Sequence, residues 1–301
     1  MVNMARMQKT TFIVLSDTHD YQFGDNASSK LQLPVPKVDV LLHCGDLTQV
    51  GGIPAFKKAL KMLSNFDAEL KLVIAGNHDL ELDEGWCKAH IEEDEDYLDD
   101  HARAMEVMKG QLAKEAGVTY LEEGTHTFNL QSGATFKIYA SPYQPEFNDY
   151  AFPYQRNEDR FNASGKTAEG VISIAENPIP AGVDIVMTHG PPKGFRDENL
   201  GCENILRAVQ RAKPLMHCFG HIHEGYGANK IVWDDARKAE DDLINEYPQA
   251  MNLHVESGKE TLMVNAAILD GEHQPTNAPW IISLELPYFQ ANTSRAGYTY
   301  R

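Results

Sequence analysis

The chain has 301 residues, of which 42% are hydrophobic and 24% are charged, a balance typical of a globular protein with a substantial core. Its formal net charge of -17 argues against a nuclease or a duplex-binding protein, which needs a basic groove, and against attraction to an anionic membrane. The four cysteines show no C-x-x-C spacing, so we expect buried, reduced thiols rather than a disulfide framework.

The N-terminal residues 1–10 lack a continuous apolar stretch, unlike a secretory signal peptide. No apolar run later in the chain approaches the roughly 20 residues needed to span a bilayer. We therefore expect an intracellular, cytoplasmic protein that does not act at a membrane.

Seven short apolar runs rich in Val, Ile and Leu recur along the chain, typical of strands inside a sheet that is covered on both faces. Helical spacing of apolar residues lies between several of them, so we expect sheets covered by helices. Gly117 is expected to end the second of three helices. The expected strands are 11–15, 38–43, 71–75, 136–140, 184–188, 215–219 and 261–267, and the expected helices lie at about 54–63, 101–116 and 202–209.

Two segments interrupt this alternation. Residues 83–100 contain a dense acidic run at 92–96, which favours a solvated loop or a helix start over a metal or partner site. Residues 229–259 are charged and mixed, and their scattered large apolar residues predict a helical excursion. Since we find no repeat and no linker, we expect a single domain over 1–301 with insertions at about 83–100 and 229–259.

Five short polar segments each follow a predicted strand and supply carboxylate, amide and imidazole donors. These donors suit two hard-to-borderline divalent cations held side by side. Two cations about 3.5–4 Å apart can clamp the attacking and leaving oxygens of a phosphoryl transfer. The segments are Asp17-Thr18-His19, Gly45-Asp46, Gly76-Asn77-His78-Asp79, Thr188-His189-Gly190 and Gly220-His221-Ile222-His223.

The spacing within these segments favours metal binding. Asp17 and His19 are two residues apart, so in an extended segment their side chains share one face. Gly45 lets the backbone turn before Asp46, whose carboxylate can bridge two cations with its two oxygens. Asn77 offers a neutral amide oxygen, which suits a hard cation. The predicted metal ligands are Asp17, His19, Asp46, Asn77, His189, His221 and His223.

The order of these motifs resembles the calcineurin-like metallophosphoesterase superfamily, and the residues around them are similar to its metallophosphoesterase-domain (brain protein-like) family. The similarity runs from about residue 11 to about residue 285. It implies an α/β fold, a four-layer α-β-β-α sandwich of two mixed sheets flanked by helices. The matching segments are Ser16-Asp17-Thr18-His19, Leu41-Leu42-His43-Cys44-Gly45-Asp46, Val73-Ile74-Ala75-Gly76-Asn77-His78, Met187-Thr188-His189-Gly190-Pro191-Pro192, Gly194-Phe195-Arg196-Asp197 and His223-Glu224-Gly225-Tyr226-Gly227.

The resemblance also implies a role for each site residue. His78 would contact the phosphate and protonate the leaving group, and Asp79 would orient its imidazole. A hydroxide activated by two divalent cations, whether Mn, Fe or Zn, would attack phosphorus in line. One cation would be held by Asp17, His19 and His223 and the other by Asn77, His189 and His221, with Asp46 bridging.

Two positions narrow the expected substrate to a small phosphorylated molecule. Ala75 stands where protein phosphatases of the superfamily carry Arg, which argues against a phosphoprotein. His221 is retained where some relatives carry Gly and are weak enzymes that bind nucleotide. We therefore expect hydrolysis of phosphodiesters, with cyclic nucleotides as the substrate class that the resemblance suggests. The alternatives are a phosphomonoesterase for a small metabolite and a nucleotide-binding regulatory protein with weak turnover.

Several other residues keep two interpretations. His43 and His217 lie on apolar strands, as core histidines or as supports for the metal ligands. Arg196 would bind a phosphate or brace its own loop. Tyr143, Phe147 and Tyr226 would stack on a base or pack in the core and rim. The sequence leaves the oligomeric state open. The histidines expected at the surface are His90, His101, His126, His254 and His273.

Overall fold

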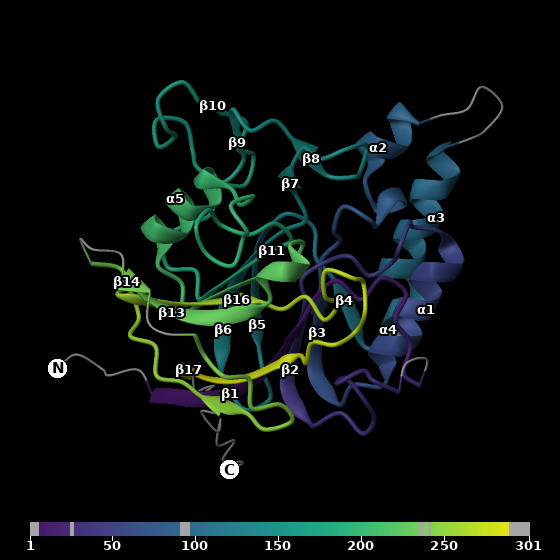
Figure 1. Cartoon of the computed structure of the whole chain (residues 1–301), viewed down its shortest axis with the longest axis horizontal. Coiled ribbons are helices and arrows are strands. Elements are labelled where there is room, and N and C mark those ends of the chain that lie inside the picture. Colours follow the sequence, from purple (N-terminus) through teal and green to yellow (C-terminus); the bar gives the residue numbers. More distant parts are fainter. Residues whose placement is uncertain (1–5, 25–26, 91–96, 235–237, 240–241, 289–301) are drawn as a thin grey trace, which may run out of the picture.

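The computed structural model describes residues 6–24, 27–90, 97–234, 238–239 and 242–288 of the chain. Two β-sheets form the centre of the molecule (Figure 1). The first sheet contains β1 (Arg6–Leu15), β2 (Val38–His43), β3 (Ala68–Val73), β4 (Val118–Tyr120), β15 (Met251–Asn252) and β17 (Trp280–Tyr288). The second contains β5 (Gly124–Asn129), β6 (Thr135–Ser141), β11 (Ile185–Thr188), β12 (Met216–Phe219), β13 (Gly227–Val232), β14 (Lys238–Ala239) and β16 (Glu260–Asn265).

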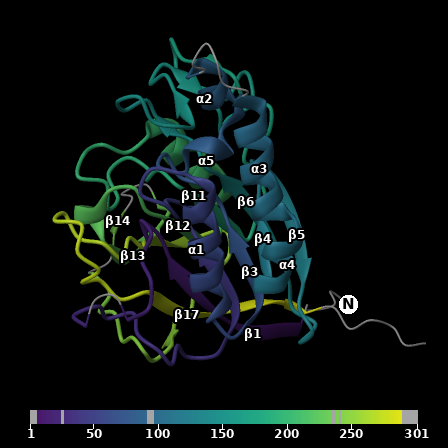
Figure 2. The same ribbon diagram turned by 90° about the vertical axis from the view of Figure 1, so that its right-hand side faces the viewer.

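Helices cover the outer faces of both sheets. Figure 2 shows α1 (Ile53–Ser64), α3 (Tyr97–Lys109) and α4 (Gln111–Ala116) along the first sheet, and α5 (Glu203–Ala212) packs on the second. The remaining elements are α2 (Glu84–Ala89), two 3₁₀ turns, η1 (Leu80–Leu82) and η2 (His223–Gly225), and the short strands β7 (Gln144–Pro145), β8 (Pro153–Tyr154), β9 (Glu158–Asp159) and β10 (Ile172–Ser173).

Both sheets are mixed. The first has the order β15-β17-β1-β2-β3-β4, in which β1 to β4 run parallel and β17 runs antiparallel to β1. The second has the order β14-β13-β16-β12-β11-β6-β5, with β6, β11, β12 and β16 parallel. The carboxyl ends of the parallel strands within each sheet therefore lie at one edge, where α/β folds collect functional side chains.

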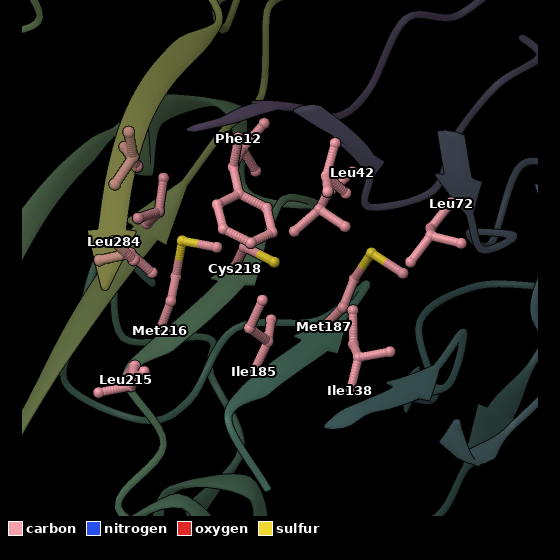
Figure 3. Packing of buried hydrophobic residues seen from close by; sticks show 14 of the residues in the cluster. Phe12, Leu42, Leu72, Ile138, Ile185, Met187, Leu215, Met216, Cys218 and Leu284 are labelled. Carbon is pink, nitrogen blue, oxygen red and sulfur yellow. The ribbon is translucent and has the colours of Figure 1, made fainter. Parts of the chain in front are cut away.

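Strand β1 shows why the central strands are apolar without alternation. Phe12 belongs to the cluster between the two sheets, where it points toward Met216 and Cys218 of the opposite sheet (Figure 3). Ile13, the next residue, belongs to the cluster under α1, α3 and α4. Because successive side chains of a strand point to opposite faces, a strand covered on both faces needs apolar residues at every position.

The predicted fold class and the seven predicted strands are confirmed, as two mixed sheets flanked by helices. The predicted helix over 101–116 is split in two at Gly110, whose backbone is extended. A Cβ at Gly110 would lie 2.3 Å from the Glu106 carbonyl oxygen, so the glycine permits this tight break. Gly117 ends α4 in the left-handed conformation with φ 69°, as predicted.

The prediction of a helical excursion at 229–259 is wrong for the described residues of that segment. Strand β13 begins at Gly227 and pairs antiparallel with β16, and the described residues up to Lys259 form strands, turns and loops. Trp233 continues this pairing by donating its backbone N–H to the Lys259 carbonyl. The apolar residues of this segment follow neither a helical nor a strand period, so its structure depends on pairing with β16.

The other interruption, 83–100, is partly helical. Asp83 caps α2 by accepting a hydrogen bond from the Gly85 backbone N–H at 2.8 Å. The acidic run 92–96 lies outside the described residues.

No helix within the described part of the chain combines the length and apolar content needed to cross a bilayer.

Candidate metal centre

The loops after β1, β2, β3, β11 and β12 converge at the edge where these strands end, and they bring the seven predicted ligands together. Asp17 and His19 follow β1, Asp46 follows β2, and Asn77 follows β3. All seven side chains are buried or nearly so, although six of them are ionisable. The residues supplied by the second sheet are His189, His221 and His223.

The donor atoms form two groups. In the first group the Nε2 atoms of His19 and His223 are 3.3 Å apart, and His223 Nε2 is 3.5 Å from Asp17 Oδ1. In the second group His189 Nε2 is 2.8 Å from Asn77 Oδ1, and the ligand atoms of Asp46, His189 and His221 lie within 4.8 Å of one another. Each group offers nitrogen and oxygen donors to one point, as a divalent cation requires.

Asp46 joins the two groups through one oxygen. Its Oδ2 lies 3.6 Å from His19 Nε2 and 3.4 Å from His189 Nε2. Its Oδ1 instead accepts the backbone N–H of His78 at 2.9 Å. Because a carboxylate oxygen has two lone pairs, Oδ1 can accept this N–H and still face a cation, so bridging by both oxygens stays a prediction.

Hydrogen bonds behind the ligands fix their orientation. His189 Nδ1 is 2.9 Å from the Cys44 carbonyl oxygen, and His223 Nδ1 is 3.2 Å from the Asp270 carbonyl oxygen. Because a carbonyl only accepts, each Nδ1 carries the hydrogen and leaves the Nε2 lone pair for the centre. Asp17 is held by the backbone N–H of His221, 3.1 Å from each carboxylate oxygen.

Electrostatics in the site are dominated by burial and by two carboxylates. Burial lowers the pKa of His221 to about 3. Burial also disfavours charge on His189 and His223, but the nearby carboxylates Asp46 and Asp17 outweigh it and raise both pKa values to about 9. The carboxylates therefore draw positive charge into the site, and a cation bound there would replace protons on these imidazoles.

Four of the predicted ligands are among the non-glycine residues whose backbone is left-handed. Asp17, His19, Asp46 and His221 have φ values of 53°, 39°, 54° and 68°, in the left-handed region. This conformation costs about 1–2 kcal/mol for a residue with a Cβ and clusters at functional sites. Converging donors, buried carboxylates and strained ligands together fit a centre for two divalent cations.

Gly220 permits the close approach of the two sheets at this centre. A Cβ there would lie 2.0 Å from Asp17 Oδ2 and 2.2 Å from Ser16 Oγ. We expect Gly220→Ala to displace the Asp17 carboxylate, to destabilise the fold by about 1–3 kcal/mol and to lower metal content. Elemental analysis and thermal unfolding measure both effects. The control is Gly85→Ala at an exposed position of α2, and equal metal content in the two variants would contradict the expectation.

An open cleft of about 460 Å³ lies above the centre. His78 lines it, with Nδ1 2.6 Å from the Gln49 carbonyl oxygen and its ring 4.4 Å from that of Tyr150. The His78 ring also meets the His19 ring edge to face at 4.7 Å. Sequence patterns do not mark the other cleft residues, which reach the site only through the fold. They include Gln49, Tyr150, Arg156, Leu200 and His273.

Asp79 does not orient the His78 imidazole. Its carboxylate accepts the backbone N–H groups of Thr48 at 2.9 Å, Gly76 at 2.9 Å and Leu47 at 3.2 Å, and the Thr48 hydroxyl at 2.8 Å. Burial and the charge of Asp46 raise its pKa to about 7. The predicted role is corrected, because Asp79 ties the loops after β2 and β3 together.

The structure places Arg196 and Tyr226 outside the cleft. The Arg196 guanidinium contacts Asp242 Oδ1 at 2.5 Å and Asn229 Oδ1 at 2.6 Å, so it braces its loop. The Tyr226 hydroxyl donates to the Ala278 carbonyl at 2.8 Å, and its ring packs toward Trp280. Both substrate-binding predictions are therefore corrected by the partners that the fold supplies.

Of the three aromatic residues considered for stacking on a base, only one lines the cleft. Phe147 stands in its wall, 60% exposed. Tyr143 lies under the Arg160 guanidinium, 3.5 Å from the ring centre, and packs edge to face on Phe152.

His43 and His217 are core histidines that support the ligand loops. His43 Nε2 is 3.0 Å from the Thr18 hydroxyl, and His217 Nε2 is 2.9 Å from the Thr188 hydroxyl. Both rings are fully buried, and burial lowers both pKa values to about 3. Thr18 and Thr188 are each next to a predicted ligand in sequence, so both histidines are core residues, and their support of the metal ligands stays a prediction.

Comparison with known proteins agrees with the motifs. A family model described as calcineurin-like phosphoesterase matches residues 10–225. The human and mouse proteins called metallophosphoesterase domain-containing protein 1 are 32% identical over 286 residues, spanning 92% of this chain and 72% of theirs. A probable rhamnogalacturonate lyase C of Emericella nidulans is 30% identical over 276 residues, spanning 86% of this chain and 23% of that protein. The solved phosphopantetheinyl hydrolase of Mycobacterium tuberculosis aligns with a TM-score of 0.45 and 13% identity, over 91% of this chain and 95% of that one.

Proposed function

The chain belongs to the calcineurin-like phosphoesterase family, and we propose that it hydrolyses small phosphodiesters, cyclic nucleotides among them, with two divalent cations. Family membership makes it a metal-dependent phosphoesterase. The observation that supports the two-cation proposal most directly is Asp46 Oδ2, placed between His19 Nε2 and His189 Nε2 at the floor of an open cleft.

The chain's own residues would hold the cations and the substrate. Two cations in these positions would supply positive charge to the phosphoryl oxygens and lower the pKa of water. The strained, hydrogen-bonded ligands keep the donors in place, so little reorganisation is needed on binding. One cation would be held by Asp17, His19 and His223 and the other by Asn77, His189 and His221, with Asp46 shared.

In the proposed reaction, His78 transfers a proton to the leaving oxygen. Its Nδ1 donates to the Gln49 carbonyl, which fixes the ring and leaves Nε2 for the cleft. The Tyr150 ring lies 4.4 Å from the His78 ring and restricts its rotation. A proton on Nε2 would pass to the alcohol oxygen as the bond from phosphorus to oxygen breaks.

The cleft walls fit an organic group beside the phosphate. Phe147 and Leu200 line the cleft and are 60% and 53% exposed, so the cleft offers apolar surface beside the metal centre. The exposed Arg156 lines the same cleft, and its guanidinium donates to the Leu200 carbonyl at 3.4 Å. Its charge favours the second candidate, a phosphomonoesterase, because a monoester carries more negative charge than a diester.

The cation identity and the location of the protein are further parts of the proposal. The nitrogen and oxygen donors suit Mn, Fe or Zn, and availability decides among them as much as affinity. The four cysteines are free and buried, which fits the proposed cytoplasmic location.

The direct test is an assay of metal-stripped protein reloaded with Mn. The substrates are a chromogenic phosphodiester, a chromogenic phosphomonoester and a panel of cyclic nucleotides, and the control is His189→Ala. We expect diester or cyclic-nucleotide turnover that requires metal and is absent in the variant. Turnover of the monoester alone would favour the second candidate. Tight nucleotide binding without turnover would leave a nucleotide-binding regulatory protein.

The variant His78→Asn separates an enzyme from a binding protein. We expect kcat to fall by about 10²–10⁴-fold, the usual contribution of a general acid, while substrate binding changes by only a few-fold. Steady-state kinetics and equilibrium binding of the same nucleotide measure the two quantities. His126→Asn, a substitution of a histidine on the edge strand β5, is the control. An unchanged kcat in His78→Asn would contradict the proton-transfer role.

A further inference from the structure

We propose that His273 is a substrate-contacting residue, which donates a hydrogen bond to a phosphoryl oxygen held at the metal centre. The inference rests on the proposed function, because it assigns a further residue to the same site. Family motifs do not include this position, and its sequence surroundings predict only a surface histidine.

The position of the ring carries the proposal. His273 lines the same cleft as His78, and its ring centre lies 5.0 Å from that of His223 and 5.9 Å from that of His19. His78 also neighbours the His19 ring, at 4.7 Å, and its other ring neighbour is Tyr150 rather than His223. Both cleft histidines therefore lie near the His19 ring, but only His273 also lies near His223. His273 is thus beside the first group of predicted ligands.

The loop that carries His273 is tied to the metal centre. The Asp270 carboxylate accepts the backbone N–H groups of Glu272 and Gln274, both at 2.9 Å, and the Thr276 hydroxyl at 2.8 Å. The backbone carbonyl of the same Asp270 accepts the His273 N–H at 2.9 Å and lies 3.2 Å from His223 Nδ1. One residue therefore orients a predicted ligand and holds the loop that presents His273.

Backbone conformation supports a functional placement. His273 has φ 57°, in the left-handed region, so the loop directs this side chain at some cost in strain. The ring is exposed, and its contacts are with histidines of the centre rather than with a hydrophobic core. Packing of a core therefore does not explain the conformation.

The donor groups distinguish a substrate contact from a metal ligand. Among the described residues, the clusters of potential ligand atoms at this site contain Asp17, His19 and His223, or His78 with His19 and Asp46, and none contains His273. An imidazole next to a cation site but outside its ligand cluster can donate to an anion bound there. Imidazole N–H to phosphoryl oxygen is a charge-assisted hydrogen bond, about twice as strong as a neutral one.

The test uses His273→Ala and His273→Gln in the full chain, reloaded with Mn, with His126→Ala as a matched surface control. We expect His273→Ala to weaken inorganic phosphate binding, measured by calorimetry, by about 10-fold and to lower kcat/KM by about 10–100-fold. The glutamine variant, which retains an N–H donor, should recover part of both. Metal content, measured by elemental analysis, should equal that of the wild type.

The outcomes separate this inference from the proposed function. Wild-type turnover with unchanged kinetics and phosphate affinity in His273→Ala would overturn the inference and leave the function intact. Loss of metal in His273→Ala would also overturn it, because His273 would then be a ligand. Absence of turnover in all proteins, with phosphate binding that still depends on His273, would overturn the function and retain the contact.

Discussion

Asp46→Asn is expected to lower kcat/KM by about 10³-fold or more, because it weakens the binding of both cations at once. The Asp46 carboxylate is the one group shared by both sets of donors, through Oδ2. An asparagine would keep the hydrogen bond from the His78 amide through its carbonyl oxygen and would place an uncharged NH₂ where Oδ2 lies. The variant therefore keeps the shape of the site but loses its central negative charge, so the affinity for both cations falls.

Steady-state kinetics at saturating Mn and the metal content of the protein measure this effect. The control is Asp67→Asn, because that carboxylate is exposed and forms a surface ion pair with Lys37 at 3.4 Å. We expect metal content to fall below one ion per chain in Asp46→Asn alone. Full occupancy with near-normal kcat/KM would show that the two groups of donors do not depend on a shared carboxylate.

Asp79→Ala is expected to destabilise the fold by about 3–5 kcal/mol. Asp79 is fully buried, and its carboxylate accepts three backbone N–H groups and one hydroxyl. Removing the acceptor leaves buried donors without partners, each of which costs about 1–3 kcal/mol, and the effect is partly offset because an ionised group no longer has to be buried. Denaturant unfolding measures the change, and Asp67→Ala is the surface control.

Asp79→Ala also tests the corrected role of Asp79. If this residue acts on the loops after β2 and β3, metal affinity and stability should fall together, because Gly76 and Leu47 flank the predicted ligands Asn77 and Asp46. A variant with normal stability and an altered pH profile of kcat would instead indicate an action on the His78 imidazole.

The centre shows how closely spaced motifs are supported by distant parts of the chain. The tautomer of His189 is set by the carbonyl of Cys44, and that of His223 by the carbonyl of Asp270. Carbonyl groups belong to every residue, so such partners leave no trace in residue types. Substitution of a predicted ligand therefore tests the metal centre itself. Substitution of a residue that hydrogen-bonds the ligand loops tests how those loops are held.

The ligands and strands were predictable from sequence because each depends on neighbours close in the chain. An apolar run followed by a short polar motif marks a strand end, and residues two apart share a face. The order of the motifs resembles that of a family to which the chain belongs. Asp17, His19 and Asp46 were predicted in this way and lie together in the structure.

The remaining features depend on contacts between distant segments. The residues near Asp79 in sequence do not reveal its hydrogen-bond partner Thr48, which only folding brings to it. Folding likewise brings Asp242 and Asn229 to Arg196. His273 reaches the cleft only because the loop before β17 folds back on the predicted ligand His223. Sequence alone predicted the donor set and determined the strand ends, because local spacing encodes both. Tertiary structure alone decided which polar group faces the cleft, because a buried hydrogen-bonding group takes the partner that folding supplies.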